Sequence, residues 1–309
     1  MPQSNFKSFF PGIEFKEPEI VKLKDELFEK NGVQVFMLRL DGIDPIISGN
    51  KLFKLIYFLI EARESLHKTI ITFGGAFSNH LAATAFTCQQ MKINSVGIVR
   101  GEKPRLLSHT LQFCIEHGMQ LEFLSRSLYK YFDSKFLQHL KNKYGQHVLI
   151  PEGGFSNKGK EGASLINNYF EDKNFTHVCL AVGTATTMAG IVDANKTQTE
   201  IIGFGVLKNL NDIPERFNEV KVHPSKKYSF IGDYHFGGYA KKTAELLSFI
   251  NWFYRKHSIP LDFVYTAKMM VGIYDLIEKK YFKSGSKILC IHTGGLQGND
   301  SLAKGTLLF

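Results

Sequence analysis

Residues 68–85 read Lys-Thr-Ile-Ile-Thr-Phe-Gly-Gly-Ala-Phe-Ser-Asn-His-Leu-Ala-Ala-Thr-Ala, and this stretch decides the class of fold. Its first residues are rich in β-branched and aromatic side chains, which predicts a strand over 68–73. Two glycines follow, and the polar residues after them begin an alanine-rich segment that is typical of a helix over 78–92. A strand that runs through a glycine turn into a helix is the repeating unit of an α/β protein.

The same alternation of strand and helix recurs along the chain. Further strands are predicted over 95–100, 121–123, 177–182, 200–206 and 287–292, and helices over 107–117 and from about residue 187. Such alternation indicates an α/β fold of two domains, each an open, mostly parallel, twisted sheet flanked by helices. Ligand sites in such folds lie beyond the carboxyl ends of the strands, so the glycine turns near residues 74, 183 and 294 are candidates.

The composition is that of an ordinary globular protein. The chain has 309 residues, of which 44% are hydrophobic and 22% charged, and its formal net charge is +9. The basic residues are scattered and accompany no nucleic-acid-binding motif, so we expect a pocket for small anions and no nucleic-acid partner. The apolar stretches fall well short of the ~20 residues that span a bilayer, so we expect no membrane partner.

Cysteine spacing and the N-terminal residues bear on the compartment. Cys88, Cys114, Cys179 and Cys290 stand far apart in apolar segments, with no CxxC pair. This spacing predicts reduced core residues and argues against a metal site or a disulfide framework. Residues 1–10 lack the basic region and long apolar core of a secretory signal. We therefore expect a cytoplasmic protein without a metal.

Two lysines stand at the start of a segment that is otherwise apolar. Residues 49–55 read Gly-Asn-Lys-Leu-Phe-Lys-Leu, so Lys51 and Lys54 point the same way on a helix. Positive charge at a helix N-terminus opposes the helix dipole. A bound anion, or an aldehyde cofactor held as an imine, would explain the pair. Taken alone, however, two lysines are more often solvated surface residues.

The three glycine turns offer polar groups to a ligand. At the first, Gly74-Gly75 allows close approach of the backbone, although a plain N-cap would explain the serine or asparagine that follows. At the second, residues 183–187 read Gly-Thr-Ala-Thr-Thr between strand and helix, which suits a phosphate but matches neither a Walker loop nor a dinucleotide fingerprint. The third contains residues 292–295, His-Thr-Gly-Gly. Tyr239 and Tyr265, taken singly, are more often packing residues.

Together these segments resemble the pyridoxal-phosphate enzymes of the tryptophan-synthase-β type, fold type II. Within that type they are similar to the group of 1-aminocyclopropane-1-carboxylate (ACC) deaminases and D-cysteine desulfhydrases. The resemblance runs from about residue 10 to the C-terminus. It rests on segments that occur in the expected order, namely Gly49-Asn50-Lys51-x-x-Lys54-Leu55, the Ser78-Asn79-His80 stretch after the double glycine, Pro151-Glu152-Gly153-Gly154, the Gly183-Thr184 turn, Asp262-x-Val264-Tyr265-Thr266-x-Lys268 and His292-Thr293-Gly294-Gly295.

The resemblance implies a place for pyridoxal phosphate, the cofactor of these enzymes. Lys51 would bind the cofactor as an imine and, once displaced by the substrate, act as the base at the substrate Cα. Such a lysine should have a low pKa, because the neutral amine must attack. Lys54 would contact the cofactor phosphate. The same phosphate would meet the backbone N–H groups of Gly183, Thr184, Ala185, Thr186 and Thr187.

Other matching residues are expected around the cofactor ring and the substrate. Asn79 would hydrogen-bond the phenolic oxygen of the cofactor, Thr266 would face its pyridine nitrogen, and Thr293 would also contact the cofactor. The helix start at Ser78, Asn79 and His80 would meet the carboxylate of a small amino-acid substrate. The catalytic residues implied by the resemblance are Lys51, Ser78, Tyr239 and Tyr265.

Two threonines bear on the choice of reaction. ACC deaminases typically have glutamate at the position of Thr266 and leucine at that of Thr293, whereas desulfhydrases tend to have a hydroxyl. A carboxylate at the pyridine nitrogen makes the ring a stronger electron acceptor, which opening a cyclopropane requires. β-Elimination requires less, so the resemblance favours a D-cysteine desulfhydrase that yields hydrogen sulfide, pyruvate and ammonia. The alternatives are an ACC deaminase and a non-catalytic protein that binds pyridoxal phosphate or another anion.

The chain departs from the family at two places. Relatives commonly have glycines where Ala185 and Thr186 stand, so the backbone must avoid positive φ there or accept strain. Phe77 replaces a glutamine, which reshapes the pocket or favours a bulkier D-amino acid. By the resemblance we expect a large cofactor-binding domain of residues 1–50 and 160–309, a small inserted domain of residues 51–159, and a homodimer.

Overall fold

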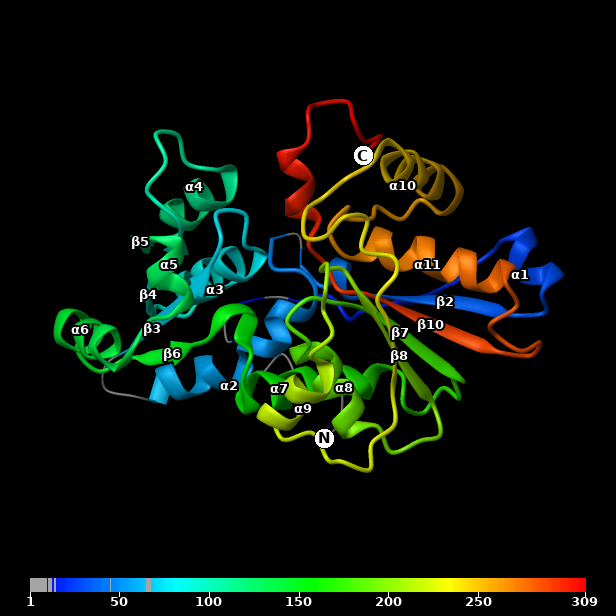
Figure 1. The fold of residues 1–309 in the computed structure, drawn as a ribbon, viewed down its shortest axis with the longest axis horizontal. Coiled ribbons are helices and arrows are strands. Elements are labelled where there is room, and N and C mark those ends of the chain that lie inside the picture. Colours follow the sequence, from blue (N-terminus) through cyan, green and yellow to red (C-terminus); the bar gives the residue numbers. More distant parts are fainter. Residues whose placement is uncertain (1–9, 11–12, 14, 45, 65–67) are drawn as a thin grey trace.

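The strands of the computed structural model form two separate sheets (Figure 1). The structure describes residues 10, 13, 15–44, 46–64 and 68–309. Residues 1–9, on which the argument about a secretory signal rests, lie outside the described residues. The fold that the sequence predicts, two mostly parallel sheets flanked by helices, is confirmed.

Within the described residues, the larger sheet has six strands, and all but one are parallel. Their order is β1 (Ile20–Leu23), β2 (Gln34–Arg39), β10 (Lys287–His292), β7 (His177–Val182), β8 (Glu200–Gly205) and β9 (Ser229–Ile231). Only β1 runs antiparallel to its neighbour, β2. The last strand in sequence, β10, therefore lies between β2 and β7, near the middle of the sheet.

Helices cover both faces of the larger sheet (Figure 1). On one face lie α1 (Glu26–Lys30), α10 (Ala244–His257) and α11 (Thr266–Glu278), and on the other lie α7 (Asn157–Ser164), α8 (Thr186–Ala194) and α9 (Ile213–Glu219). In β10, Ile288 and Cys290 face one apolar core, while Leu289 and Ile291 face the other. Burial on both faces is what makes the strands of a parallel sheet almost wholly apolar.

The smaller sheet is parallel throughout. Its order is β5 (Met119–Leu124), β4 (Asn94–Arg100), β3 (Thr69–Gly74) and β6 (Val148–Ile150). Its flanking helices are α3 (Asn79–Gln90), α4 (His109–Glu116), α5 (Arg126–Lys130) and α6 (Ser134–Tyr144), and short 3₁₀ turns lie at η3 (Leu40–Gly42), η4 (Glu152–Gly154), η5 (Leu165–Tyr169) and η6 (Leu296–Ser301). The residue limits of the two domains stay a prediction.

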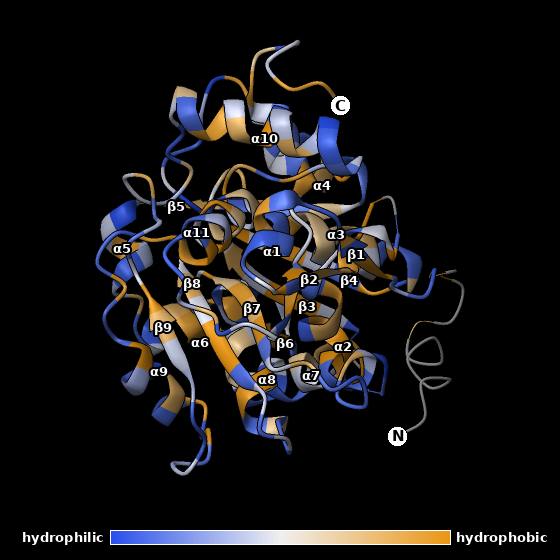
Figure 2. Ribbon diagram, turned by 90° about the vertical axis from the view of Figure 1, so that its right-hand side faces the viewer, coloured by the Kyte–Doolittle hydropathy of each residue, from blue (hydrophilic) through white to orange (hydrophobic). Residues whose placement is uncertain are grey.

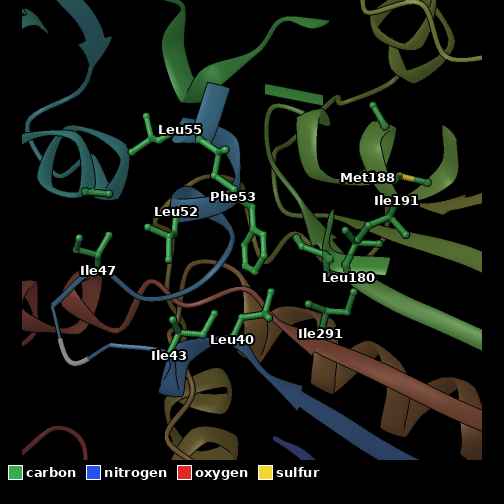
Figure 3. Close-up of a cluster of buried hydrophobic side chains, with 14 of the residues drawn as sticks. Leu40, Ile43, Ile47, Leu52, Phe53, Leu55, Leu180, Met188, Ile191 and Ile291 are labelled. Carbon is green, nitrogen blue, oxygen red and sulfur yellow. The ribbon is translucent and has the colours of Figure 1, made fainter. Parts of the chain in front are cut away.

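Helix α2 (Asn50–Glu64) connects the two sheets through a shared core (Figure 3). Leu52, Phe53 and Leu55 are fully buried on it. They belong to one cluster with Leu180 and Ile291 of the larger sheet, which also takes in strands of the smaller one. Because every side of its first turns is packed, this helix holds whatever it carries at its N-terminus in a fixed place between the sheets.

The distribution of apolar residues agrees with this layering. Figure 2 shows hydrophobic residues gathered in the central strands and hydrophilic ones on the outer sides of peripheral helices such as α10. All four cysteines are buried and free, which confirms the expectation of reduced core residues. Among the described residues, no helix is both long and apolar enough to cross a membrane.

Candidate active site

The start of α2 rests directly on the loop that follows β10. Gly49 has φ 83°, and a Cβ there would lie 2.0 Å from the carbonyl oxygen of Thr293. A Cβ on Gly294 (φ 74°) would in turn lie 2.9 Å from the Cα of Gly49. The amide N–H of Asn50 donates to the Thr293 carbonyl at 3.2 Å. Two glycines are therefore required for this crossing, which places the next residue, Lys51, over the carboxyl end of the sheet.

Lys51 is buried, lies near the start of α11 and is linked through Asn50 to the start of α8. Its Nζ donates to Asn50 Oδ1 at 2.7 Å, and Asn50 Nδ2 donates to Thr187 Oγ1 of α8 at 2.7 Å. The same Nζ lies 5.2 Å from the ring centroid of Tyr265, the residue before α11. The expected active-site lysine thus lies within reach of both the 183–187 turn and one of the expected tyrosines.

Lys54 lies one helical turn further along, against a loop of the smaller sheet. Its Nζ donates to the carbonyl oxygen of Gly153 at 2.5 Å. Gly153 has φ 65°, and a Cβ there would lie 2.7 Å from Thr184 Cγ2. Lys54 and the 183–187 turn therefore face each other across the η4 loop. In the sequence, the η4 loop belongs to a segment that resembles the family. The contacts of Gly153 with Lys54 and Thr184 could not be predicted from it, because they join residues far apart in the chain.

Burial shapes the charge of both lysines. It lowers the pKa of Lys51 to about 8, against the opposing effect of the Asp262 carboxylate. It lowers the pKa of Lys54 well below its usual value, and the charge of Lys51 lowers it further. Two cations that repel each other in a buried place are favourable only if an anion joins them. The sequence-based expectation of a low pKa for Lys51 agrees with the lowered value of about 8.

The N-terminus of α8 is built to receive such an anion. Its N-cap residue, Ala185, has φ 67° and ψ −8°, and among the described residues no side chain caps the helix. Thr186 and Thr187, the first two helical residues, are buried. Thr184 and Thr186 join their hydroxyls at 3.0 Å. Of the two outcomes expected at the altered turn, the backbone thus accepts strain, and it does so at Ala185.

The N-terminus of α11 is capped from within the protein. Asp262 is fully buried, and its carboxylate accepts from the N–H groups of Val264 (3.0 Å), Tyr265 (2.6 Å) and Thr266 (2.9 Å). Of these donors, Thr266 is the first residue of the helix, Tyr265 is its N-cap and Val264 precedes both. The Ala267 N–H donates to the backbone carbonyl of Asp262 at 3.0 Å, so one residue satisfies several free donors at this helix start. We predicted no role for Asp262, although an acidic residue just before a helical stretch is the usual signal of a cap.

Seven buried side-chain polar atoms have no hydrogen-bond partner among the described residues, and three of them belong to expected site residues. These three are Asn79 Oδ1, Thr266 Oγ1 and His80 Nδ1. Asn79 and Asp262 meet at Gly295, because a Cβ there would lie 3.0 Å from Asn79 Nδ2 and 3.6 Å from the Asp262 carboxyl carbon. A buried polar atom without a partner costs about 1–3 kcal/mol. Such atoms are expected where a ligand completes the bonding.

His80 faces the lysine side of the site. Thr72 Oγ1 donates to the Ile150 carbonyl, so it accepts from His80 Nε2 at 2.9 Å, and the free lone pair lies on Nδ1. Burial lowers the pKa of His80 well below its usual value, and the charges of Lys54 and Lys51 lower it further. The imidazole is therefore neutral. Its expected contact with a substrate carboxylate stays a prediction.

Ser78 is the N-cap of α3, as expected if the serine after the double glycine serves only to start the helix. Its hydroxyl oxygen accepts from the Leu81 amide N–H at 3.3 Å. Its hydroxyl hydrogen is not consumed by that bond, so a role toward substrate stays compatible with the cap. Neighbouring Phe77 is 49% exposed, and its ring centroid lies 5.9 Å from that of His109. Phe77 thus adds an apolar surface beside the N-terminus of α3.

The two expected tyrosines lie next to each other. Their ring centroids are 6.2 Å apart, with an interplanar angle of 69°. Burial raises the pKa of Tyr265 well above its usual value, and Tyr239 adds to the increase. Burial also raises the pKa of Tyr239, although 44% of its surface stays exposed. Both phenols are protonated near neutral pH and can donate hydrogen bonds.

The expected site residues converge at the ends of three strands. Lys51, Lys54, Asn79, Thr187, Tyr265 and Thr266 are linked by the contacts described above. Thr293 is buried, and its carbonyl oxygen supports the start of α2. No group of three or more His, Cys, Asp or Glu residues that could hold a metal occurs in the part of the chain that the structure describes.

Comparison with known proteins gives consistent matches. A family model described as "Pyridoxal-phosphate dependent enzyme" matches residues 19–294. A Thermotoga maritima protein, provisionally named 1-aminocyclopropane-1-carboxylate deaminase, is 30% identical over 91% of this chain and 95% of its own. The Arabidopsis thaliana bifunctional D-cysteine desulfhydrase/1-aminocyclopropane-1-carboxylate deaminase, mitochondrial, is 30% identical over 87% of this chain and 74% of its own.

A solved structure described as an ACC deaminase homologue superimposes with a TM-score of 0.78. It is 26% identical and covers 95% of this chain, with 94% of its own chain aligned. The match therefore extends over both sheets and the region between them.

Proposed function

This chain belongs to the family of pyridoxal-phosphate dependent enzymes, and from that premise we propose that it is a lyase that converts D-cysteine and water into hydrogen sulfide, pyruvate and ammonia. Its cofactor is pyridoxal phosphate, and its group is that of the ACC deaminases and D-cysteine desulfhydrases. The observation that carries the choice of substrate is the buried, neutral hydroxyl of Thr266.

The residues present fit the cofactor. A phosphate matches the uncapped start of α8. The buried Lys54, which binds Gly153 of the η4 loop where that loop meets Thr184, would supply it with a positive charge. Asn79 and Thr266 are polar residues with an unpartnered buried atom each, and the amide NH₂ of Asn79 and the hydroxyl of Thr266 are donors for the oxygen and nitrogen of a polar ring. Lys51, Lys54, Asn79, Thr266 and the 183–187 turn would therefore hold the cofactor. When bound, pyridoxal phosphate supplies a conjugated electron acceptor for the bonds that break at the substrate Cα.

Lys51 is assigned to moving the proton at the substrate Cα. Its lowered pKa of about 8 leaves a sizeable neutral fraction at physiological pH, as a base requires. Asp262 lies near enough to oppose this decrease, so the lysine can hold the proton once it has taken it. Asn50 orients the Nζ by accepting its hydrogen bond.

Tyr265 is assigned to the leaving group. Its pKa is raised well above the usual value, so its hydroxyl keeps its proton at neutral pH and can donate a hydrogen bond to the departing thiolate. The ring lies 5.2 Å from Lys51 Nζ, a separation that supports a donor and a base acting on one small substrate. Ser78, Asn79 and the start of α3 are left to bind the substrate carboxylate, with Phe77 beside them.

Thr266 favours elimination over ring opening. A hydroxyl can exchange a hydrogen bond with the ring nitrogen but supplies no negative charge to keep a proton there. A carboxylate at that position would supply the charge, and the cleavage of a cyclopropane that lacks a Cα hydrogen needs the stronger electron acceptor. Loss of sulfide from the β carbon of D-cysteine needs less, because a good leaving group departs.

ACC deaminase is the second candidate, and the names of the relatives favour it. The Thermotoga protein is provisionally named as an ACC deaminase, and the Arabidopsis enzyme carries both activities in its name. The two functions are therefore alternatives within one site. Acting on ACC, the enzyme would yield 2-oxobutanoate and ammonia.

A panel of substrates separates these functions. D-Cysteine, L-cysteine and ACC are supplied to the holoenzyme, and sulfide, ammonia and the two keto acids are measured. We expect sulfide and pyruvate in equal amounts from D-cysteine. Production of 2-oxobutanoate from ACC without sulfide from D-cysteine would replace the first proposal by the second. Failure to turn over any of the three, with the cofactor bound, would favour a non-catalytic binding protein.

Replacing Lys51 tests the assignment of the base. In Lys51→Ala, we expect the covalent cofactor absorbance to be lost and kcat to fall by about 10⁴-fold, the upper range for a positioned proton-transfer group. Absorbance spectra and keto-acid assays measure both. Lys158→Ala is the control, since this lysine is 45% exposed and pairs with Glu61 at the surface. A surviving covalent band in Lys51→Ala would contradict the assignment.

A cytoplasmic location and a homodimer are also part of the proposal. Both rest on the sequence and on the resemblance. Sedimentation of the purified holoenzyme would measure the oligomeric state, and fractionation of the source cells would measure the location.

A further inference from the structure

Lys268 is a buried cation to which the proposed reaction assigns no role. It lies in the first turn of α11 and is fully buried. Its Nζ donates to the carbonyl oxygens of His235 at 3.0 Å and Gly238 at 2.7 Å. Both acceptors belong to the segment 235–240, which carries Tyr239. An ammonium bound to two carbonyls of one segment fixes that segment relative to the helix.

The segment 235–240 has a costly backbone conformation. Phe236 (φ 50°) and Ala240 (φ 52°) lie in the left-handed region, and Gly237 (φ 88°) and Gly238 (φ 117°) also have positive φ. Non-glycine residues hold such angles only when surrounding contacts enforce them. Within the segment, Gly237 and Gly238 donate to the side chain and the carbonyl of His235. Lys268 supplies the hydrogen bonds that tie this strained segment to α11.

A second contact holds the chain just before the segment to the same helix. The Tyr234 hydroxyl donates to Asp275, about two turns beyond Lys268 on α11. A Cβ on Gly238 would lie 3.4 Å from Lys208 Cβ, so the far side of the segment is also in contact. Lys268 is therefore the anchor nearest to the site, while Tyr234 holds the more distant part.

Tyr239 depends on this anchoring for its position. Its side chain is 44% exposed, so packing alone does not fix it, and its ring meets that of Tyr265 at 6.2 Å. We propose that Lys268 is a positioning residue, which holds the 235–240 segment so that Tyr239 faces Tyr265 and the substrate. This inference rests on the proposed function for its catalytic consequence, but the anchoring itself does not.

Burial and a neighbouring carboxylate act on Lys268 in opposite directions. Burial lowers its pKa to about 8, and Asp262, the cap of the same helix, opposes the decrease. The ammonium form with three donors therefore predominates at neutral pH. One buried aspartate thus acts on two lysines, Lys51 and Lys268, at the same end of α11.

Lys268→Met is the principal test, because methionine fills similar space without a donor. In the holoenzyme we expect faster deuterium uptake by the backbone amides of residues 235–241 and an unchanged cofactor spectrum. With D-cysteine, or with ACC if that is the substrate, we expect kcat to fall about tenfold or more with a smaller change in KM. In a Tyr239→Ala background, Lys268→Met should cause little further loss of kcat.

Lys160→Met is the matched control. Lys160 is also buried, and it donates to the Lys221 carbonyl at 2.9 Å and to Asp193 at 2.7 Å, away from the two tyrosines. We expect this variant to leave uptake at 235–241 and the kcat unchanged. Lys268→Gln, which keeps a donor on a shorter side chain, should restore part of the protection at 235–241.

Each result supports or overturns the inference. Unchanged uptake at 235–241 in Lys268→Met would overturn the anchoring. An equal loss of kcat with and without Tyr239 would overturn the route through that tyrosine. If neither Lys268→Met nor Lys268→Gln folds by near-ultraviolet circular dichroism, Lys268 is a requirement of the fold and the positioning role is rejected. If the wild type turns over no substrate, the proposed function fails, while the exchange measurement still decides the anchoring.

Discussion

Helices α8 and α11 both begin at the candidate site, but their N-termini are satisfied in opposite ways. At α11, the buried Asp262 accepts three backbone N–H bonds, so the helix carries its own anion. At α8, the N-cap is Ala185 in a left-handed conformation, and no side chain of the described residues caps the helix. Both starts present the same free donors and the same positive end of a helix dipole.

The difference separates stability from binding. Since α11 is complete without a ligand, its cap should contribute to folding of the apoprotein. Since α8 is not, its donors and the adjacent Lys54 are left for an anion from outside, the cofactor phosphate in our proposal. A substitution at the start of α11 should therefore change the free energy of unfolding, whereas a substitution at the start of α8 should change the cofactor affinity.

Lys54→Met should give the largest effect and should act on binding. We expect cofactor affinity to fall by about 100-fold, because a buried partner of the phosphate is removed. The apoprotein should be no less stable, since a buried cation is replaced by an apolar side chain. Equilibrium dialysis and urea denaturation measure the two quantities. A large loss of apoprotein stability with unchanged affinity would reverse the comparison.

Asp262→Asn should act on stability. An asparagine offers one accepting oxygen and no charge, so we expect the free energy of unfolding of the apoprotein to fall by about 2 kcal/mol. Asp133→Asn is the control, because Asp133 caps the exposed start of α6 through one bond to Phe136 at 3.0 Å. Urea denaturation without cofactor should show a small change there. An equally small change in Asp262→Asn would break the contrast.

The pH dependence of cofactor attachment tests how Asp262, the cap of α11, affects the pKa of Lys51. The neutral amine is the reactive form, and the pKa is lowered to about 8. Below that pH, we expect the attachment rate to rise about tenfold per pH unit, and above it to level off. Stopped-flow absorbance of apoprotein mixed with pyridoxal phosphate measures the rate. In Asp262→Asn the midpoint should move lower, because the opposing carboxylate is gone. A midpoint near 10.5 would contradict the assignment.

Ala185→Gly should give the smallest effect. Glycine adopts φ 67° without steric cost, so we expect the apoprotein to gain about 0.5–1 kcal/mol after the entropy cost of glycine. Urea denaturation measures the gain. Asn174→Gly is the control at φ 53°, where asparagine already tolerates the left-handed region and little change is expected. A loss of stability in Ala185→Gly would show that the alanine methyl contributes more by packing than it costs by strain.

Local patterns in the sequence predict much of the fold. The strands expected over 177–182 and 287–292 have those limits in the structure, and α8 begins one residue before the expected start. The strand expected over 121–123 corresponds to β5, which is longer in the structure. The prediction was too short because only the first residue of β5 is buried, so its apolar pattern in the sequence is weak. We did not predict β1, β2, β6 or β9, of which β6 and β9 have three residues each.

The site could be predicted less completely, because its contacts join distant residues. Lys51, Lys54 and Thr266 are recognisable from short motifs. The contact of Gly153 with Thr184 and the bond from Lys54 to Gly153 depend on how the two sheets meet. The same holds for Lys268, whose motif gives no sign that it binds a segment about thirty residues earlier.

The position of β10 constrains how the enzyme is made. Of the strands that the structure describes, this one is the furthest along the sequence, yet it lies between β2 and β7, and its following loop supports Asn50 next to Lys51. During synthesis, the ribosome must therefore release the chain beyond residue 292 before the larger sheet can close. Until then the start of α2 lacks the Thr293 carbonyl that supports Asn50 next to Lys51. The two apolar cores on either side of β10 also lack the side chains of this strand. Capture of the cofactor by Lys51 should accordingly follow the synthesis of residues 287–293.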